Sequence, residues 1–200
     1  GSFLVDNPAA VLTLNGIIDG LALTKTGLGT LVLGVANTYT GSTIVNGGAL
    51  NISSDANLGA VPATFQDDAI TLNKSSTLAL TADVALDANR GIVLGVEGIQ
   101  TITGIGGSAV PFPGGISGAG GVAFNGNPGQ LSLGYTNTYT GETRVMGAAR
   151  LIEGGERAFQ FSTVTDAPGG SIFAHSGPGA AVIGGLAGDF DFPLETVTGP

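Results

Sequence analysis

Residues 29–47 read GTLVLGVANTYTGSTIVNG, and residues 129–147 read GQLSLGYTNTYTGETRVMG. The two stretches align without a gap at an offset of 100 residues, and 12 of the 19 aligned positions are identical. The pentapeptide NTYTG recurs whole, and paired leucines precede it in both copies (Leu31/Leu33 and Leu131/Leu133). Self-similarity at a fixed period is the signature of a repeat architecture. The sequence therefore predicts a long repeat of about 100 residues, present roughly twice.

Short runs of alternating apolar and polar residues surround these copies, and Gly, Asn, Asp, Ser or Pro separates them. Such runs predict strands joined by tight turns; they are residues 11–14, 31–33, 43–45, 50–52, 69–72, 77–80, 91–94 and 101–103. The best helical candidate is the brief segment 82–89. Aliphatic residues recur in pairs within the runs, so we expect them to stack as ladders inside a solenoid. A propeller would show a blade period of roughly 40 to 50 residues, about half the period seen here.

The composition fits a protein made of strands and turns. The chain has 36 Gly, 10% charged residues and no Cys, whereas an ordinary domain has about 25% charged residues. The net charge is −9, and the six basic residues are scattered, so the chain lacks the basic stripe that nucleic-acid binding requires. The absence of Cys excludes disulfides and thiolate metal sites. No apolar run approaches the roughly 18 residues of a membrane-spanning helix, so we expect no membrane insertion by this segment.

The stretch GLGTLVLGVANTYTGSTIVNGGALNI (residues 27–52) resembles the autotransporter-associated β-strand repeat, also called the passenger-associated transport repeat. The resemblance runs from Gly27 to Leu50 and again from Gly129 to Val145. Residues 57–73 and 87–104 are similar to elements that lie between such copies. The resemblance implies a right-handed parallel β-helix, export across the outer membrane, and display outside a Gram-negative-type cell.

We therefore expect an all-β, right-handed parallel β-helix (β-solenoid). Residues 1–152 would form a β-helix of two long repeats, and residues 153–200 would continue it or form an irregular extension. We expect the sequence to be a piece of a longer polypeptide. Its partners would be further repeats of that polypeptide or other copies of itself, end to end, and beyond these surface glycans or the surfaces of host or neighbouring cells.

The leading functional hypothesis is a structural and adhesive segment of a secreted, cell-surface protein, with no enzymatic activity and no cofactor. The alternative is a glycan-binding or glycan-cleaving β-helix, and a third hypothesis is a phage-type fibre segment. Clustering of Tyr39, Tyr139 and carboxylates in one groove would favour the glycan reading. The two tyrosines are thus possible ligand contacts that could stack on sugar rings, although a packing role at a corner is the favoured interpretation.

Other polar residues offer weaker sites. Asp189 and Asp191 lie on one side of an extended segment and form a weak candidate for a cation site, with an exposed acidic edge as the alternative. His175 is the single histidine, and we expect it in a turn. Asp67-Asp68 is the most obvious acidic cluster, and we expect it in a solvated turn before the strand 69–72. The remaining charged cluster comprises Arg144 and Arg150 with Glu142 and Glu153, for which we expect surface ion pairs.

Overall fold

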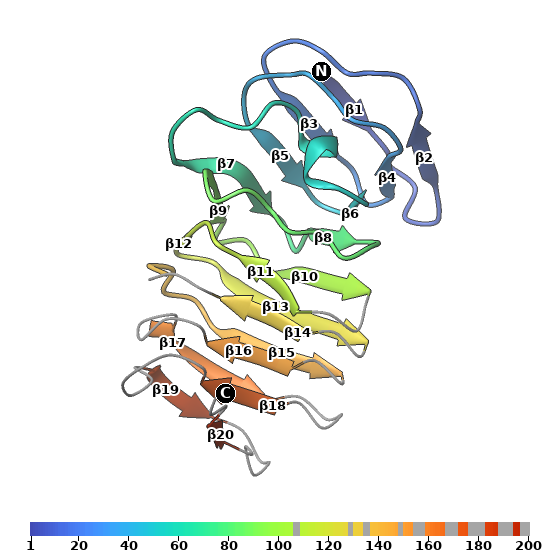
Figure 1. Ribbon diagram of the computed structural model, residues 1–200. Helices are drawn as coiled ribbons and strands as arrows, with labels where there is room; N and C mark the ends of the chain where they lie inside the picture. The colour runs from blue at the N-terminus through green and yellow to red at the C-terminus, as the bar shows by residue number, and fades with distance from the viewer. Residues whose placement is uncertain are drawn as a thin grey trace.

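The computed structural model describes residues 1–105, 109–127, 130–133, 137–147, 150–153, 159–166, 172–175, 183–187 and 194–196. Within these residues the chain winds into a stack of coils, and parallel strands of successive coils pair with one another (Figure 1). The stack begins with the N-terminus at one end, and the later strands follow in chain order towards the other (Figure 1). The expectation of an all-β, parallel β-helix is confirmed.

The strands of the described residues form three sheets. Sheet A contains β1 (Ser2–Leu4), β3 (Leu23–Thr26), β5 (Thr43–Asn46), β7 (Gln66–Asn73), β9 (Arg90–Leu94) and β12 (Ile116–Gly118). Sheet B contains β2 (Val11–Leu14), β4 (Thr30–Leu33), β6 (Ala49–Ile52), β8 (Thr77–Leu80), β10 (Ile99–Ile105), β13 (Gly121–Asn127), β15 (Thr143–Gly147), β17 (Phe159–Asp166) and β19 (Ile183–Ala187). Sheet C contains β11 (Ala109–Phe112), β14 (Gln130–Leu133), β16 (Arg150–Glu153), β18 (Ile172–His175) and β20 (Leu194–Thr196). Strands β17 to β20 thus extend sheets B and C beyond residue 152. All eight predicted strands are present.

Each coil has three sides. In the middle of the chain the order β9, β10, β11 visits sheets A, B and C, and β12, β13, β14 repeats that order one coil later. In the first coils the third side consists of extended segments rather than strands. There the Thr38 amide donates to the Ile18 carbonyl, and the Ala60 amide donates to the Tyr39 carbonyl, at 2.9 Å each. These bonds satisfy backbone groups that would otherwise be buried without partners.

The core is built of side-chain ladders that run from coil to coil. Alternation along each strand points every second side chain inward, and register pairing stacks these residues on one another. One column of register partners in sheet B is Leu12, Leu31, Leu50, Leu78, Ile102, Phe124 and Val145. From Leu31 onward every member is 0% exposed, whereas Leu12 at the end of the stack is 37% exposed. The predicted aliphatic ladders are therefore confirmed, and each coil is buried by its neighbours.

The two copies of the long repeat occupy different sides of the coil. Strands β4 and β5 of the first copy belong to sheets B and A, but their equivalents 100 residues later, β14 and β15, belong to sheets C and B. Starting at Thr43, four coils pass before the chain reaches Thr138 above β12, and Thr143 follows on the next side. The repeat therefore advances by four coils and one side.

The helical prediction for residues 82–89 is wrong. The segment is extended, with Val84 and Leu86 buried and Asp83 and Ala85 exposed, so it follows the alternation of a strand. A 3-10 turn lies instead at η1 (Asp55–Leu58), and its first turn is capped by the Ser54 hydroxyl. No helix among the described residues has the length and apolarity to cross a membrane.

Candidate functional site

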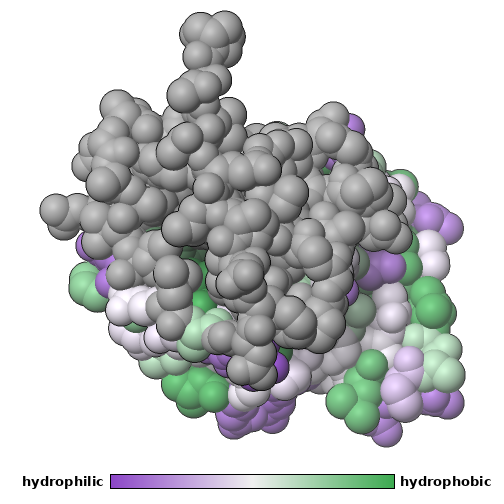
Figure 2. Space-filling view, turned by 90° about the horizontal axis from the view of Figure 1, so that it is seen from below, coloured by the Kyte–Doolittle hydropathy of each residue, from purple (hydrophilic) through white to green (hydrophobic). Residues whose placement is uncertain are grey.

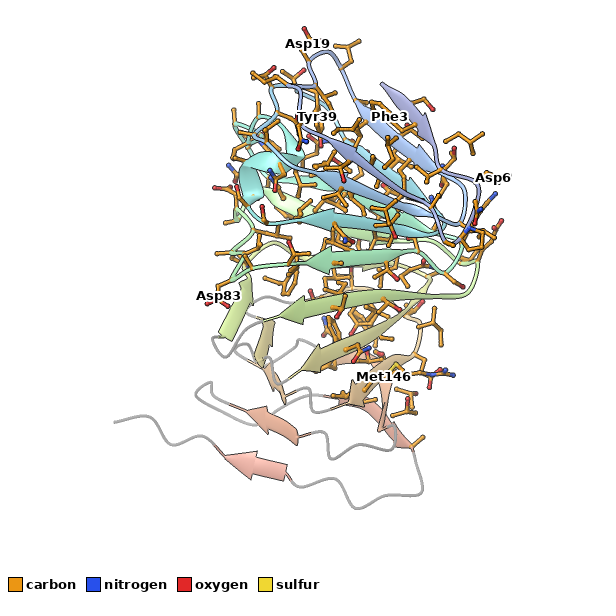
Figure 3. All side chains as sticks on the ribbon, turned by 90° about the vertical axis from the view of Figure 1, so that its right-hand side faces the viewer. Phe3, Asp6, Asp19, Tyr39, Asp83 and Met146 are labelled. Atoms are coloured by element: carbon orange, nitrogen blue, oxygen red, sulfur yellow. The ribbon has the colours of Figure 1, made fainter. Side chains whose placement is uncertain are left out.

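The NTYTG pentapeptide forms a buried corner of the coil. Tyr39 is 0% exposed, and its hydroxyl lies 2.7 Å from Oγ1 of Thr43, the first residue of β5. Figure 3 shows Tyr39 among the first coils, whereas Asp19 and Asp83 point away from them. Gly41 follows the corner because the chain passes so close to Leu21 that a Cβ there would lie 1.9 Å from the Leu21 carbonyl oxygen. Burial raises the pKa of the Tyr39 phenol.

The second copy repeats this corner one side further round the coil. Tyr139 is 1% exposed, and its hydroxyl lies 2.6 Å from Thr143 Oγ1. Thr143 is in turn 2.6 Å from the Ser162 hydroxyl, which donates to the Gly141 carbonyl at 2.7 Å. The hydroxyl chain ties the corner to β15 and to β17. Burial again raises the phenol pKa of Tyr139.

These positions correct the hypothesis that Tyr39 and Tyr139 contact a ligand. Rings exposed by 0% and 1% cannot stack on a sugar, because the core covers both of their faces. The threonines on either side of each tyrosine are exposed. The favoured interpretation, a packing role at a corner, is the one that the structure shows.

Asn37, at the start of the same corner, joins three coils through its amide. Its Oδ1 accepts from the Ile18 amide at 2.8 Å, and its Nδ2 donates to the Asn57 carbonyl at 2.7 Å. Asn137 keeps part of this arrangement, since its Oδ1 accepts from the Ile116 amide at 2.8 Å. The asparagine side chains thus supply hydrogen bonds where the corner segments lack regular strand pairing.

Sequence reasoning missed Lys25, which stands inside the core. It pairs in register with Phe3 and Val45 and is 0% exposed. Its ammonium donates to the carbonyl oxygens of Gly27 and Gly47 at 2.6 and 2.8 Å. Burial lowers its pKa. The alternation Leu23-Thr24-Lys25 was the available signal, because it places Lys25 on the same side as a buried leucine.

Arg90 is the second buried base that sequence reasoning missed. Its side chain leaves the start of β9 and reaches η1, where Nη1 and Nη2 donate to the carbonyls of Leu58 and Gly59 at 3.1 and 2.8 Å. Its Nε lies 2.9 Å from Oδ1 of Asp55, which also accepts the Asp87 amide. The guanidinium therefore links two coils through residues that are more than 30 positions apart in sequence.

An open cavity of about 210 Å³ lies on the outside of sheet A. Its lining residues are Phe65, Asp67, Gly115, Ile116, Ser117 and Thr138. The loop before β7 supplies an exposed aromatic ring and β7 itself supplies a carboxylate, while β12 and the second NTYTG corner supply one hydroxyl each. This hollow therefore offers exposed groups that could take part in recognition.

The remaining candidates have separate outcomes. Asp67 and Asp68 are both exposed but lie within β7, not in a turn before it, because the register with β9 shifts between Gln66 and Ile70. Arg144 forms the expected surface ion pair with Glu142 at 2.9 Å, and this hydrogen bond lowers the pKa of the Glu142 carboxyl.

Several candidates have no described side-chain geometry. Asp189 and Asp191 lie outside the described residues, and so do the side chains of Arg150, Glu153 and His175. The backbone of His175 belongs to β18, not to a turn. Within the described part of the chain no three His, Cys, Asp or Glu side chains gather where they could hold a metal ion.

Comparison with known proteins agrees with the sequence resemblance. Residues 23–52 and 118–149 match the model of the passenger-associated transport repeat. The chain is also similar to a protein named "Adhesin BmaC autotransporter" from Brucella suis biovar 1 (strain 1330), with 42% identity over 79 residues. That match covers 39% of this chain and 2% of the adhesin. No solved structure matches the chain significantly. The two matched segments contain the two NTYTG corners described above, so the chain carries two segments that match the passenger-associated transport repeat.

Proposed function

We propose that the chain is a structural and adhesive segment of a secreted autotransporter-like protein displayed on a bacterial cell surface. The observation that carries this proposal is the stack of coils bearing two passenger-associated transport repeats, with corners closed by Tyr39 and Tyr139. Similarity to an autotransporter adhesin supports the adhesive part. The role would be non-catalytic, because hydrogen-bonded coils provide stiffness and the outward loops provide contacts.

Adhesion is tested with the purified 200-residue chain coupled to beads at a defined density. Retention of the beads on animal cells or on other bacteria, above beads carrying an unrelated acidic β-protein, would support adhesion. Equal retention of both bead types would contradict it. Display is tested by antibody labelling and protease shaving of intact cells that make the whole protein. Labelling only after lysis would contradict the extracellular location.

The partners we propose first are further coils of the same polypeptide. Strands β1 and β2 each pair on one side only, and their apolar residues are exposed, with Leu4 at 68% and Val11 at 64%. Unpaired strand edges bind another strand readily, and a further coil would continue the Leu12 column. Sedimentation of this chain over a range of concentrations tests the alternative of end-to-end self-association. A compact monomer at high concentration would contradict that alternative.

A second candidate function is glycan binding or cleavage, and the cavity beside Phe65 and Asp67 is the observation that favours it. Retention of the chain on a panel of neutral and acidic polysaccharides, with released products assayed in the same tubes, separates the two. Retention without products supports binding alone, whereas released oligosaccharides would contradict the non-catalytic role.

A further inference from the structure

The cavity on sheet A has a floor and a wall. Its floor consists of Gly115, the first two residues of β12 (Ile116 and Ser117) and Thr138, whose amide donates to the Ile116 carbonyl at 2.9 Å. Its wall is the segment of β7 and the preceding loop that carries Phe65 and Asp67. Residues about 50 positions apart in the sequence therefore meet at this one place.

The wall includes a β-bulge in β7. Gln66 pairs with Arg90 and Ile70 with Ile92, so the β7 strand has extra residues between two pairs, and a bulge of this kind redirects side chains. The bulge rests directly on Gly91, where a Cβ would lie 2.5 Å from the Asp67 carbonyl oxygen.

Side-chain hydrogen bonds brace the bulge. The Gln66 amide donates to the Ser42 hydroxyl at 3.0 Å and to Asp68 Oδ1 at 2.9 Å. The wall is thus held by contacts on both sides, while Gly115 adds no side chain to fill the space beneath it.

Phe65 is 54% exposed, although an aromatic ring gains most by burial. One of its neighbours in the cavity is the exposed carboxylate of Asp67, and Ser117 and Thr138 contribute hydroxyls. An aromatic face carries partial negative charge and attracts polarised C–H groups. A carboxylate accepts strong hydrogen bonds from hydroxyl donors. A pyranose ring combines these two features, with C–H groups on one face and hydroxyls around its edge.

We propose that this cavity binds a single neutral pyranose unit of a surface glycan, with the ring on Phe65 and two hydroxyls donating to Asp67. The inference deepens the adhesive role proposed above and rests on it. The volume of about 210 Å³ is below the roughly 300 to 1,000 Å³ of pockets for larger ligands, so one ring fits and a chain would extend outside.

Charge separates neutral from acidic sugars. Among the described residues that line the cavity, Asp67 is the one charged group, Asp68 follows it in the chain, and the protein carries a net charge of −9. Uronates and phosphates would meet like charge with no base to neutralise them. Figure 2 shows hydrophobic residues scattered among hydrophilic ones around the rim of the surface. An exposed aromatic ring alone therefore does not identify a binding site. The carboxylate and the hydroxyls beside Phe65 distinguish this cavity from such isolated residues.

The experiment is saturation-transfer NMR on the full 200-residue chain with methyl glucoside, methyl galactoside, methyl mannoside and sodium galacturonate as separate probes. We expect transfer to the ring C–H protons of at least one neutral glycoside and none to galacturonate. Phe65→Ala should abolish the transfer, and Asp67→Asn should weaken binding by about tenfold, the usual effect of removing a hydrogen bond to a charged group.

Phe161→Ala and Asp83→Asn are the matched controls. Phe161 is 56% exposed, nearly the same as Phe65, and Asp83 is an exposed carboxylate elsewhere; both variants should bind as the unaltered chain does. Absence of transfer to all neutral glycosides, transfer that persists in Phe65→Ala, or stronger transfer to galacturonate than to the neutral glycosides would overturn the proposal. If beads carrying Phe65→Ala still adhere to cells as before, adhesion stands and the pyranose site fails.

Discussion

Arg90 and Asp55 lie 35 positions apart in the chain, yet the Arg90 Nε is 2.9 Å from Asp55 Oδ1 and the guanidinium is almost completely buried. The same guanidinium donates to the carbonyls of Leu58 and Gly59. One side chain therefore holds the 3-10 turn of one coil against the first strand residue of a later coil. The pair lies where the third side has no regular strand pairing, so its loss should destabilise both coils.

Replacing Arg90 should destabilise the chain far more than replacing the arginine of the exposed ion pair. Arg90→Met removes the charged partner of Asp55 and the donor to two carbonyls, and breaking a buried pair costs about 3 to 5 kcal/mol. Arg144→Met is the matched control, because Arg144 pairs with Glu142 but its side chain is 48% exposed, and such pairs contribute about 0 to 1 kcal/mol. Urea unfolding followed by circular dichroism measures both. Equal losses would contradict the structural role of Arg90.

The two buried phenols should make the fold sensitive to alkaline pH. Burial raises the pKa of Tyr39 and Tyr139 in the folded chain, while the unfolded chain titrates near 10. Their contribution to stability is therefore complete below about pH 10 and is lost as the pH rises towards the folded-state pKa values. The double variant Tyr39→Phe, Tyr139→Phe should lose part of this dependence between about pH 10 and 11.5.

The comparison of the double variant with the unaltered chain isolates the phenols, since every other titratable group is common to the two proteins. Thermal melting at pH 7 and at intervals above pH 9 measures the effect. At pH 7 the variant should be less stable by about 1 kcal/mol for each lost hydroxyl hydrogen bond. Parallel pH curves for the two proteins would show that the phenols do not control the alkaline transition.

Shortening one rung of the leucine ladder should have a large effect. Leu78 is 0% exposed and stands between Leu50 and Ile102 in the sheet B column. Leu78→Ala removes packing and leaves a cavity, at a cost of about 2 to 5 kcal/mol. Val11→Ala is the control, because Val11 is 64% exposed on an edge strand, and the change should stay within about 0.5 kcal/mol. Denaturant unfolding measures the free energy of unfolding of both variants. A loss in Leu78→Ala no larger than that in Val11→Ala would mean that the stability of the coils does not depend on this ladder.

The buried ammonium of Lys25 should stabilise its corner. Lys25→Met keeps the length and apolar stem but removes the donor to the Gly27 and Gly47 carbonyls, and leaving buried acceptors unsatisfied costs about 1 to 3 kcal/mol. Lys74→Met serves as the control, since Lys74 is exposed. If Lys25→Met proved more stable at pH 7, the desolvation of the charge would outweigh its hydrogen bonds.

The alternation of apolar residues was enough to predict eight strands and the ladders, because a buried strand needs an inward side chain at every second position. The same rule, applied strictly to residues 82–89, would have corrected the helical prediction, since Val84 and Leu86 are inward and Asp83 is not. Lys25 and Arg90 were missed because a basic residue at an inward position interrupts the apolar alternation of a strand. Their burial is explained only by the backbone carbonyls that accept their hydrogen bonds, and the sequence does not show these.

The cavity could not be predicted from the sequence. It depends on the bulge of β7 and on the stacking of Thr138 above Ile116, which bring together residues that no local pattern relates. The side of the coil on which each repeat lies could not be predicted from the sequence either. Register partners in successive coils are 19 residues apart for Thr30 and Ala49 but 28 for Ala49 and Thr77, and a long loop conceals how far the chain has turned.

Because each repeat advances by four coils and one side, successive repeats are related by a rotation about the axis as well as a translation along it. With about 4.8 Å of rise per coil, equivalent corners of the two copies are separated by roughly 21 Å along the axis and face directions one third of a turn apart. A longer array with the same advance would return to a given direction after three repeats, or about 60 Å. Contacts offered by one repeat would then point to all sides of the rod in turn, so a target could be met whichever way the rod had rotated.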